Sequence, residues 1–513
     1  MFVRIITAAI QGITAIPVGV EINTRRGIGY TMVGLPDSSV REGHERIRSA
    51  LKMSGMDMPS KLTTINMTPA DLRKEGSGYD LPLAVGFMVC NEEIPRHSAD
   101  GSVFIGELSL DGSVLPVRGV LPIAVMARDI GCRRIFVPAD NAAEAAVVDG
   151  LEVYAVKNLK ALRRVLSGED DANAALVEHT PWQEPEVWAE EDFINVKGQQ
   201  QARRALEIAC SGGHNVILVG SPGSGKSMMA KCIPGILPPM TQEEALTTTK
   251  IHSVAGKTPL FNGLMQTRPF RAPHHSVSSV AMIGGGRNPQ PGEISLANGG
   301  VLYLDEFAEF PRNVLEVLRQ PLENRSITIS RAEYCVDYPA DFMLVASMNP
   351  CPCGYYGHPT RPCACTPTQV QKYMGRISGP LLDRIDLHIQ ILPVSFDEIS
   401  SREKPESSAA IRERVIRTRA VQTERFREEP GVFCNAQMNS SLLAQYAALS
   451  PSCERLMKTA VEKLQLSARA YSRILKVART IADMDRSPDI RDADLAEAIQ
   501  YRALDRSSWG REW

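Results

Sequence analysis

The residues with the most recognisable chemistry lie in the segment 220–227, which reads GSPGSGKS. This G-x-x-x-x-G-K-S pattern follows an apolar run and leads into a helical pattern, the context in which it forms a phosphate-binding loop. Glycine lets backbone N–H groups turn inward around phosphate oxygens, and the start of the helix adds positive charge. We expect Lys226 to reach the β and γ phosphates of ATP, and the Ser227 hydroxyl to bind Mg²⁺. The predicted nucleotide contacts are Gly220, Ser221, Pro222, Gly223, Ser224, Gly225, Lys226 and Ser227.

Polar residues end two further apolar runs. Asp305 and Glu306 follow the run 301–304, where Asp305 would complete the Mg²⁺ site and Glu306 would act as general base towards water. An apolar strand that ends in acids is common, so this pair is informative only together with the phosphate loop. Asn349 ends a run that begins at residue 341, and it could position the water or contact the γ-phosphate. A turn-forming Asn before Pro350 explains this residue equally well.

Four cysteines, Cys351, Cys353, Cys363 and Cys365, form two C-x-C pairs within a short segment. Four thiolates can hold Zn²⁺ in a tetrahedron, with the residues between the pairs folding back. His358 could replace one thiolate. A disulfide or redox switch, or two unrelated pairs of buried thiols, are the alternatives. We expect a structural metal site rather than a reactive centre.

The segments that must position these residues divide the chain into four parts. Residues 1–167 alternate short β-rich runs with helical patterns. Residues 168–193 are acidic and contain no Lys or Arg, which is typical of an exposed linker. In 194–394, runs of Val, Ile and Leu alternate with helical patterns, as in a parallel α/β sheet. Residues 395–513 show apolar residues at helical spacing and predict a helical domain.

The order of these motifs resembles that of AAA+ ATPases of the magnesium-chelatase and MCM-like branch. The segments that carry the resemblance are the phosphate loop, LYLDE, MNP and ISGPLLDRIDLHI (377–389). The stretch 268–306, from RPFRAPHH to LYLDE, is similar to the ComM/YifB family, and the resemblance covers essentially the whole chain. It implies a P-loop AAA+ parallel sheet with a helical lid. It also implies a ring-forming ATPase, a hexamer, with each ATP bound between neighbouring subunits.

The resemblance gives roles to two arginines. Arg384, in LLDRID, matches the arginine finger, which inserts into the site of the neighbouring subunit. Arg469 matches the sensor-2 arginine of the lid, which reaches the γ-phosphate of its own subunit. Arg473 is a rival for the lid role that spacing alone does not separate from Arg469. A surface salt bridge for Arg384 and a solvated helix face for Arg469 are the local alternatives.

Two basic segments are candidates for contact with DNA. SITIS, flanked by Arg325 and Arg331, and the following EYCVDY predict a β-hairpin, which in the resembling family points into the channel of the ring. Basic residues there would grip the phosphate backbone without reading sequence. The second segment is an insert between the phosphate loop and the acid pair. Salt bridges explain each cation about equally well. The candidates in the insert are Arg268, Arg271, His274, His275 and Arg287.

The N-terminal part resembles the α+β Lon-protease-like domain (ribosomal S5 domain 2-like) in the stretches 74–86 and 106–131. A Ser-Lys peptidase would need a serine in the first stretch and a lysine in the second. Ser77 lies one place from the nucleophile position, and Ile123 occupies the place of the lysine. We therefore expect a non-proteolytic scaffold or DNA-docking domain.

Composition limits the location and the partners. The net charge of −2 means that contacts with nucleic acid must be local. The longest candidate membrane segment, 81–90, is shorter than the ~20 residues that a spanning helix needs, so we expect no membrane contact. Eleven cysteines, an odd number that is mostly scattered, fit a reducing compartment, so we expect a cytoplasmic protein.

Three classes of function follow from the sequence. The ComM/YifB resemblance implies a DNA motor, a hexameric helicase or branch-migration ATPase acting on single-stranded or branched DNA in recombination or natural transformation. The first alternative is a magnesium-chelatase-type ATPase subunit. That activity relies on partner subunits with a D-x-S-x-S metal motif, which this sequence lacks. The second alternative is a AAA+ chaperone or regulator that acts on proteins.

Overall fold

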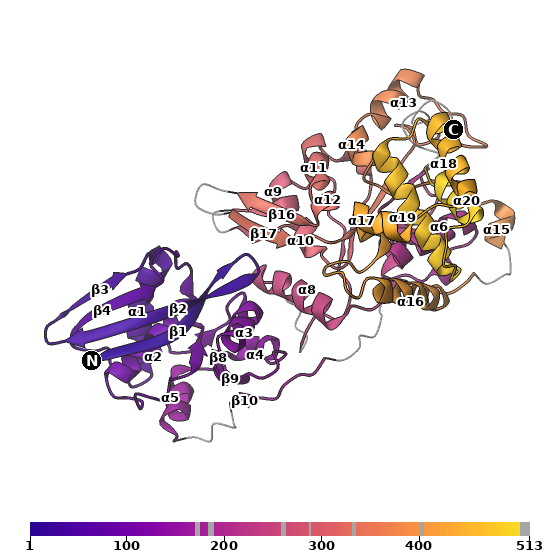
Figure 1. Cartoon of the computed structure of the whole chain (residues 1–513). Helices are drawn as coiled ribbons and strands as arrows, with labels where there is room; N and C mark the ends of the chain where they lie inside the picture. Colours follow the sequence, from indigo (N-terminus) through magenta and orange to yellow (C-terminus); the bar gives the residue numbers. More distant parts are fainter. Residues whose placement is uncertain are drawn as a thin grey trace. The chain divides into compact units, whose positions relative to one another are not determined.

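The chain folds into two compact units (Figure 1). The computed structural model describes residues 1–169, 175–182, 189–257, 263–286, 289–330, 335–400 and 405–502. The N-terminal unit consists of Met1–Glu184 and Gln242–Met265, and the C-terminal unit of Pro185–Thr241 and Gln266–Trp513. The segment Gln242–Met265, which the sequence places within the α/β part, therefore packs with the N-terminal unit instead.

A mixed eight-stranded sheet forms the centre of the N-terminal unit, in the order β10-β9-β8-β5-β1-β2-β4-β3. β1 and β2 form a long antiparallel hairpin in which Phe2 pairs with Asn23. Side chains alternate between the faces of a strand, and Val18, Val20 and Ile22 of β2 are fully buried. The strands are β1 Phe2–Gln11, β2 Thr14–Arg25, β3 Gly29–Val33, β4 Leu62–Thr68, β5 Ser102–Phe104, β8 Arg134–Pro138, β9 Glu152–Val156 and β10 Leu176–Val177, with a separate ribbon of β6 Glu107–Leu108 and β7 Val114–Leu115.

Helix α8 is joined to the rest of the N-terminal unit by buried polar contacts. The Ser253 hydroxyl donates to the buried carboxylate of Glu144, and the Gly119 N–H donates to the Ser253 carbonyl at 3.2 Å. Burial raises the pKa of Glu144, against the lowering effect of this hydrogen bond. These partners lie far apart in the sequence, so no local pattern places α8 here. The helices of this unit are α1 Ser38–Met53, α2 Asp80–Cys90, α3 Val120–Asp129, α4 Ala142–Ala145, α5 Leu159–Ser167 and α8 Gln242–Val254.

The residues that bear on peptidase chemistry lie in or before α2 and α3. The Ser77 hydroxyl donates to the carboxylate of Glu107. Ile123, which occupies the place of a catalytic lysine, is buried in α3. Ser77 thus has an acidic partner instead of the amine base that a Ser-Lys peptidase needs. This contact favours the prediction of a non-proteolytic domain.

A parallel sheet of five strands forms the centre of the C-terminal unit, in the order β12-β15-β18-β11-β19. Every neighbouring pair is parallel, which confirms the predicted parallel α/β sheet. All residues of β11, β15 and β18 are buried, as expected for a parallel sheet covered on both faces. The strands are β11 Val216–Gly220, β12 Phe270–Arg271, β15 Val301–Leu304, β18 Met343–Met348 and β19 Leu387–Ile391.

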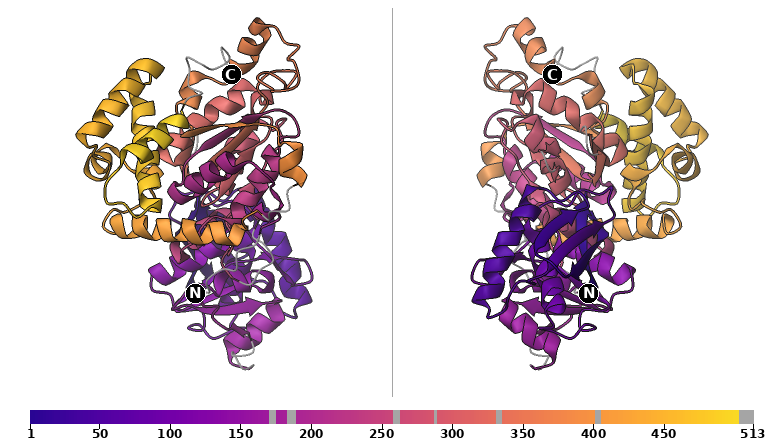
Figure 2. Two further views of the ribbon diagram at one scale, coloured as in Figure 1. Left: turned by 90° about the vertical axis from the view of Figure 1, so that its right-hand side faces the viewer. Right: turned by 90° about the vertical axis from the view of Figure 1, so that its left-hand side faces the viewer.

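The predicted helical C-terminal region is also present, and Figure 2 shows its helices gathered at one side of the C-terminal unit. Its apolar core is continuous with that of the sheet: Ile474 of α19, Ile208 of α6 and Leu218 of β11 belong to one buried cluster. Among the described residues, no helix is both long and apolar enough to cross a membrane. The helices of the C-terminal region are α16 Ser408–Arg425, α17 Ser440–Tyr446, α18 Pro451–Leu464, α19 Ala468–Met484 and α20 Asp492–Gln500. The helices that precede α16 in this unit include α6 Gln200–Gly212, α7 Lys226–Cys232, α10 Glu293–Leu296, α11 Arg312–Glu316, α12 Pro321–Asn324, α13 Pro367–Met374, α14 Gly379–Leu382 and α15 Phe396–Ser400.

The C-terminal unit contains two small hairpins. Helix α9 Ser279–Ile283, which lies near β16 and β17 in Figure 1, leads directly into the second of them. The predicted hairpin is present as β16 Ser326–Ser330 and β17 Cys335–Pro339. The second pairs β13 Gly284–Gly285 with β14 Gln290–Pro291. The Tyr338 hydroxyl of β17 donates to the Pro289 carbonyl at 2.8 Å. Gly284 is close to the first hairpin, since a Cβ built there would lie 3.0 Å from Ile329 Cδ1. The two hairpins therefore pack as one element.

Candidate nucleotide-binding site

The three motifs predicted to bind nucleotide meet at one edge of the parallel sheet. Strands β11, β18 and β15 are neighbours, and the carboxyl ends of parallel strands lie at the same edge. The Ser227 hydroxyl, after β11, donates to Asp305 Oδ2 at 2.9 Å. Lys226 Nζ lies 3.3 Å from Asn349 Oδ1, at the end of β18. The fold thus brings together residues separated by more than a hundred positions in the sequence.

Lys226 is held in the loop by backbone carbonyl groups. Its ammonium donates to the Gly220 carbonyl at 2.7 Å and to the Ser221 carbonyl at 2.9 Å. Burial lowers the pKa of Lys226 to about 8, although the negative charge of Asp305 acts in the opposite direction. Gly223 and Gly225 adopt positive φ angles of 76° and 90°, a conformation that glycine tolerates and that turns the loop around the ammonium.

Asp305 is fixed by hydroxyl groups from helix α7 and from the neighbouring strand β18. Besides Ser227, the Ser347 hydroxyl donates to Asp305 Oδ1, and Ser347 lies 3.0 Å from the Tyr303 hydroxyl. Burial would raise the pKa of Asp305, but these hydrogen bonds outweigh it and the pKa lies below its ordinary value. Sequence reasoning missed Ser347. Its signal was a polar residue inside the apolar strand β18, two positions before Asn349 and so on the same face.

Glu306 lies next to Asp305 but points to a different partner. Its backbone has a positive φ of 52°, and its side chain is 59% exposed. Glu306 Oε2 lies 3.1 Å from Nδ1 of His275. The His275 ring also packs edge-on against Phe310, with ring centroids 6.4 Å apart. The structure therefore places His275, a predicted DNA contact, against the predicted general base instead.

Arg384, the predicted arginine finger, is largely buried in the C-terminal unit, with 7% of its side chain exposed. One guanidinium nitrogen donates to the Pro380 carbonyl at 2.7 Å, and another donates to the carboxylate of Glu323 on α12. Arg469 approaches the same carboxylate, with a nitrogen 3.8 Å from Glu323 Oε1. The two arginines that the sequence places at nucleotide sites thus converge on one glutamate.

The structure separates Arg469 from Arg473, which spacing could not do. Arg473 forms an ion pair of 3.1 Å with Asp386, which is fully buried, and only 17% of the Arg473 side chain is exposed. Burial would raise the pKa of Asp386, but the charge of Arg473, with the nearby His214 ring and the Asn215 N–H, holds it well below its usual range. Arg469 is 57% exposed. Arg473 therefore joins α19 to the residue just before β19, and Arg469 is the more exposed of the two arginines.

Two of the predicted DNA contacts instead hold the fold together. The guanidinium of Arg268 donates to the carbonyl groups of Pro238 and Gly299 at 2.6 Å each. Arg271 forms a bidentate ion pair with Glu293, with N–O distances of 2.7 and 2.8 Å. These internal partners use the donors that a phosphate backbone would need, which argues against both predictions.

The remaining predicted DNA contacts differ in their surroundings. His274 is exposed, and its Nδ1 lies 2.9 Å from the Ser276 hydroxyl. Arg325, just before β16, lies 3.6 Å from Asp341 Oδ1 and is 31% exposed. Arg287 and Arg331 lie outside the described residues.

The four cysteines come together after Asn349. Their sulfur atoms all lie within 4.8 Å of one another. Cys351 is 3.3 Å from Cys353 and 3.7 Å from Cys363, and Cys353 is 3.5 Å from Cys363. Disulfide sulfur atoms would be about 2.05 Å apart, so the arrangement is a cluster of thiols. The predicted clustering of the two C-x-C pairs is confirmed.

Profiles of magnesium-chelatase families match three parts of the chain. The family described as magnesium chelatase, subunit ChlI, matches residues 192–399, which contain the phosphate loop, the acid pair, Asn349, Arg384 and the four cysteines. The family described as subunit ChlI of Mg-chelatase matches residues 20–141. The family of the ChlI C-terminal region matches residues 405–502, the helical region.

Comparison with individual proteins gives the same result over the full length. The uncharacterized protein YifB of Escherichia coli is 42% identical over 503 residues, covering 98% of this chain and 97% of YifB. Competence protein ComM of Haemophilus influenzae is 40% identical over 511 residues, covering 97% of each chain. The magnesium-chelatase subunit ChlI of Euglena gracilis is 23% identical over 224 residues, 39% of this chain and 58% of that subunit. The chain therefore belongs to the ComM/YifB family of magnesium-chelatase-like AAA+ proteins.

Proposed function

We propose that this protein is a ring-forming ATPase that uses the energy of ATP hydrolysis to move or remodel DNA, as a helicase or branch-migration motor. The observation that carries the proposal is the convergence of the phosphate loop with Asp305 and Asn349 at one edge of the parallel sheet. The similarity to a competence protein over nearly the whole chain supports DNA as the substrate.

ATP and Mg²⁺ fit the groups at this edge. Lys226 would exchange the carbonyl groups of Gly220 and Ser221 for phosphate oxygens. Mg²⁺ would be held by the Ser227 hydroxyl and the Asp305 carboxylate, which lie 2.9 Å apart and are the oxygen ligands that it prefers. The low pKa of Asp305 keeps that ligand ionised. When bound, the ion would neutralise negative charge on the phosphates.

Hydrolysis requires Glu306 to accept a proton from the attacking water. Its side chain is largely exposed beside the phosphate loop and is held by His275 at 3.1 Å. Asn349, which contacts Lys226 at the end of β18, would orient the water or the γ-phosphate. We assign the base role to Glu306 and the positioning role to Asn349.

We propose that Arg384 and Arg469 act on the same nucleotide, that of the neighbouring subunit. Both cations meet the carboxylate of Glu323, so a phosphate group that replaced this carboxylate would contact both. The family resemblance predicts that Arg384 acts at the nucleotide site of the neighbouring subunit and Arg469 at the site of its own subunit. Because both arginines approach the same carboxylate of Glu323, they would act at one nucleotide site rather than at two. Assembly of a ring, with exchange of Glu323 for phosphate, would therefore complete each site.

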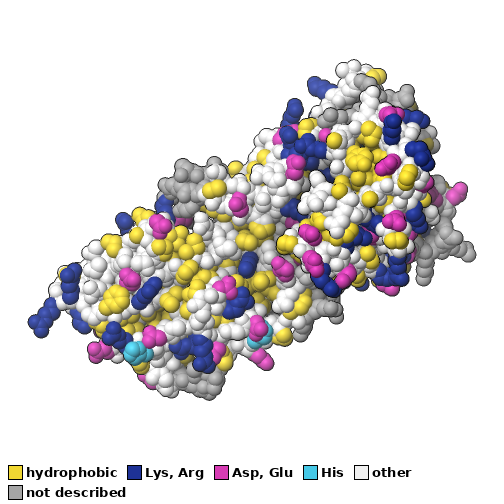
Figure 3. All heavy atoms as spheres, viewed as in Figure 1, with side chains coloured by type: hydrophobic (Ala, Val, Ile, Leu, Met, Phe, Trp, Pro, Cys, Tyr) yellow, Lys and Arg dark blue, Asp and Glu magenta, His cyan; other side chains and the backbone are white. Residues whose placement is uncertain are grey.

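The proposed DNA surface is the pair of packed hairpins. Basic and acidic side chains are interspersed on the face in Figure 3, and the net charge is −2, so DNA binding must depend on a local feature. The hairpins pack through Tyr338 and Pro289, and their connecting segments carry Arg287 and Arg331. We propose these two arginines, with the exposed His274 and with Arg325, which lies 3.6 Å from Asp341, as backbone contacts. Arg268, Arg271 and His275 are left out because they have closer internal partners.

The cysteines support a cytoplasmic location for this motor. All eleven are free of disulfide bonds, as expected in a reducing compartment. Seven of them are buried, where a thiol serves as a small apolar side chain. We propose the cytoplasm, where ATP is available to such a motor.

ATP turnover of the full chain, measured with and without forked and Holliday-type DNA, tests the proposed function. We expect both DNAs to bind and to raise turnover. Arg331→Ala should reduce the stimulation and the salt dependence of DNA binding. Arg133→Ala, an exposed arginine of the N-terminal unit, is the control. If neither DNA binds nor changes turnover, a DNA motor is the wrong assignment.

Two site variants test the ATPase part separately. Lys226→Ala should abolish nucleotide binding. Glu306→Gln should bind ATP and accumulate assembled rings while turnover falls by roughly 10²- to 10⁴-fold, the usual contribution of a general base. Turnover of Glu306→Gln at the wild-type rate would show that another group accepts the proton.

A magnesium-chelatase-type ATPase subunit is the second candidate. The observation in its favour is that all three matching families are named for the ChlI subunit. ATP turnover stimulated by chelatase partner subunits and a porphyrin, but unaffected by DNA, would favour this function over the DNA motor.

A further inference from the structure

The loop between β18 and α13, residues 349–366, carries chemistry that the proposed ATPase does not use. We call it the cysteine loop. It begins at Asn349, which contacts Lys226 of the phosphate loop, and it contains the four clustered thiols. One question is what the thiols bind, and the other is what the loop does for the nucleotide site.

The spacing of the thiols matches a tetrahedral metal site. Sulfur atoms about 2.3 Å from a Zn²⁺ ion in a tetrahedron are about 3.8 Å apart. The three separations among Cys351, Cys353 and Cys363 are 3.3, 3.5 and 3.7 Å, and all four sulfur atoms lie within 4.8 Å of one another. Backbone N–H groups already point at two sulfur atoms, from Tyr356 to Cys351 at 3.3 Å and from Cys365 to Cys363 at 3.4 Å. Such N–H groups stabilise the negative charge of thiolates, the form that binds metal.

His358 is not a fourth ligand in this arrangement. Its Nδ1 accepts hydrogen bonds from the backbone N–H groups of Thr360 and Arg361, at 3.1 and 3.0 Å. Its ring lies edge-on to Tyr355, with centroids 5.6 Å apart. Cys365, whose sulfur lies within 4.8 Å of the other three, completes the set. The candidate ligands are therefore four thiols, whose thiolate forms favour Zn²⁺ over hard cations.

The cysteine loop lies directly against the phosphate loop. A Cβ built on Gly354 would lie 2.6 Å from Cδ of Pro222 and 2.7 Å from its Cγ. Gly354 also has a positive φ of 84°, so glycine is needed both for the turn and for the close approach. Cys353 and Gly354 are adjacent, so the position of the thiol cluster fixes the position of this contact.

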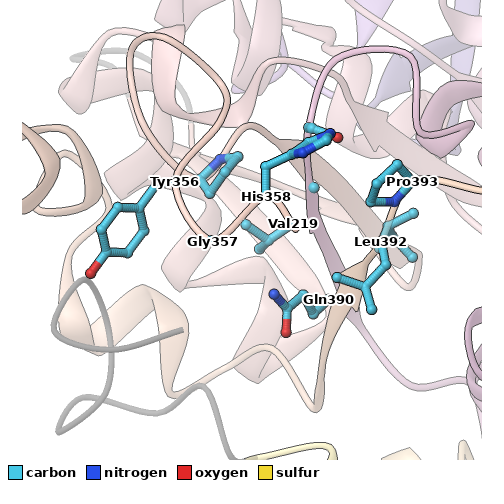
Figure 4. Close-up of a pocket in the computed structure, with 11 residues that line it drawn as sticks. Val219, Tyr356, Gly357, His358, Gln390, Leu392 and Pro393 are labelled. Atoms are coloured by element: carbon cyan, nitrogen blue, oxygen red, sulfur yellow. The ribbon is translucent and has the colours of Figure 1, made fainter. Parts of the chain in front are cut away.

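A small pocket is lined by residues of both loops (Figure 4). Tyr356, Gly357 and His358 of the cysteine loop line it together with Gly220 and Ser221 of the phosphate loop. The remaining lining residues are Val219, Pro350, Gln390, Ile391, Leu392 and Pro393. The cysteine loop thus borders the phosphate loop. A change that loosens the cysteine loop would therefore remove support from the nucleotide site.

We propose that Cys351, Cys353, Cys363 and Cys365 bind one Zn²⁺ ion, and that this ion holds the cysteine loop against Pro222 so that tight binding of ATP requires zinc. Binding converts four thiols and one Zn²⁺ into a tetrathiolate complex with release of four protons. The proposal of a zinc site is based on the geometry of the four thiols. The coupling to ATP rests on the nucleotide-binding function proposed above.

Metal analysis and nucleotide titration of the wild-type full chain form the first test. We expect one zinc per chain. Removal with a chelator should weaken binding of a fluorescent ATP analogue roughly tenfold to a hundredfold, the effect of a shift of about 1 Å in a positioning group, and zinc should restore it. Circular dichroism shows whether the chelated chain is still folded. Less than half an equivalent of zinc with four freely reactive thiols would overturn the site. Unchanged ATP affinity of the folded, zinc-free chain would overturn the coupling.

Single-residue variants test the zinc site and the contact between Gly354 and Pro222 separately. Cys363→Ser should lose zinc and weaken ATP binding, whereas Cys335→Ser, at an exposed cysteine of β17, should do neither. Gly354→Ala keeps all four thiols but collides with Pro222, so it should retain zinc and still bind ATP less tightly. Wild-type ATP affinity in Gly354→Ala with zinc bound would overturn the coupling. A wild-type chain that holds zinc but binds no ATP would refute the proposed ATPase and the coupling while leaving the zinc site standing.

Discussion

At the scale of single residues, the site owes its geometry to polar groups that are already paired before a ligand arrives. Asp305 is held by Ser227 of α7 and Ser347 of β18, and Lys226 by two carbonyl groups and Asn349. Groups that are fixed in this way need little reorganisation to meet charge on a substrate. The charge state of Lys226 and the partner of Glu306 are the two features with direct consequences for activity.

ATP binding should weaken at alkaline pH because of Lys226. Burial lowers its pKa to about 8, so above that pH the free protein loses the ammonium that pairs with the phosphates. We expect the dissociation constant to rise by roughly tenfold for each pH unit above 8. Nucleotide titrations from pH 7 to pH 9.5 measure this change. Lys226→Arg, which stays charged throughout, should show no such slope, and a flat wild-type profile would contradict the assignment.

His275→Ala should raise ATP turnover in the absence of DNA. His275 holds Glu306 at 3.1 Å, so its loss frees the proposed base to reach water. We expect a rise of about fivefold, the lower end of typical coupling effects, and a smaller stimulation by DNA. Ser276→Ala, an exposed neighbour in the same loop, is the control. Turnover that falls in His275→Ala, or rises equally in the control, would exclude a restraining role.

At the scale of elements, helix α19 shows how one face can carry two functions. Arg469 and Arg473 are four residues apart and so lie on the same side of the helix. Asp386, just before β19, binds Arg473 and leaves Arg469 exposed. The neighbouring strand, and not the helix itself, therefore decides which arginine supports the fold.

Arg473→Ala should destabilise the C-terminal unit strongly. It would leave the carboxylate of Asp386 buried without its cation, which typically costs about 3–5 kcal/mol. Arg469→Ala removes an exposed cation and should change the free energy of unfolding by less than about 1 kcal/mol, while it lowers ATP turnover. Denaturant unfolding of both variants measures the difference. Equal stability of the two variants would show that the Arg473–Asp386 pair contributes little.

At the scale of the whole molecule, ATP turnover in mixtures of two inactive variants tests the proposed ring. A chain with Lys226→Ala lacks the lysine of the phosphate loop, and a chain with Arg384→Ala and Arg469→Ala lacks both arginines. In a mixed ring, the intact loop of one chain meets the intact arginines of the other, so ATP turnover should reappear on mixing. The rate is measured as the ratio of the two chains is varied.

The same mixtures distinguish the two assignments of Arg469. If Arg469 serves its own subunit, mixing Lys226→Ala with Arg469→Ala restores nothing, whereas mixing Lys226→Ala with Arg384→Ala does. Mixing Lys226→Ala with Asn349→Ala is the control, because both of these residues belong to one subunit's site and no intact site can form.

Much of the fold and of the nucleotide site could be predicted from local patterns. The phosphate loop, the acid pair and the two C-x-C pairs combine residue types that are required at fixed spacing, and the parallel sheet follows from its long apolar runs. The SITIS hairpin was predicted by alternation of apolar and polar residues, and β16 and β17 confirm it. In each case the physical cause acts over a few neighbouring residues.

The roles of single cations could not be predicted in this way, because an arginine or histidine takes its role from a partner distant in the sequence. Arg271 is bound by Glu293 and His275 contacts Glu306, although both lie in a basic segment that suggests DNA. Likewise Ser253 and Glu144 place α8 in the N-terminal unit against its position in the sequence.

The sequence alone therefore determined the family, the parallel sheet, the phosphate loop and the clustering of the four cysteines, because these depend on residue type and spacing. Only the tertiary structure decided which arginine of α19 is exposed, that Arg384 and Arg469 meet at Glu323, and that Gly354 lies against Pro222. These facts depend on which side chains become neighbours when distant strands and helices pack, and no local pattern in the chain encodes that choice.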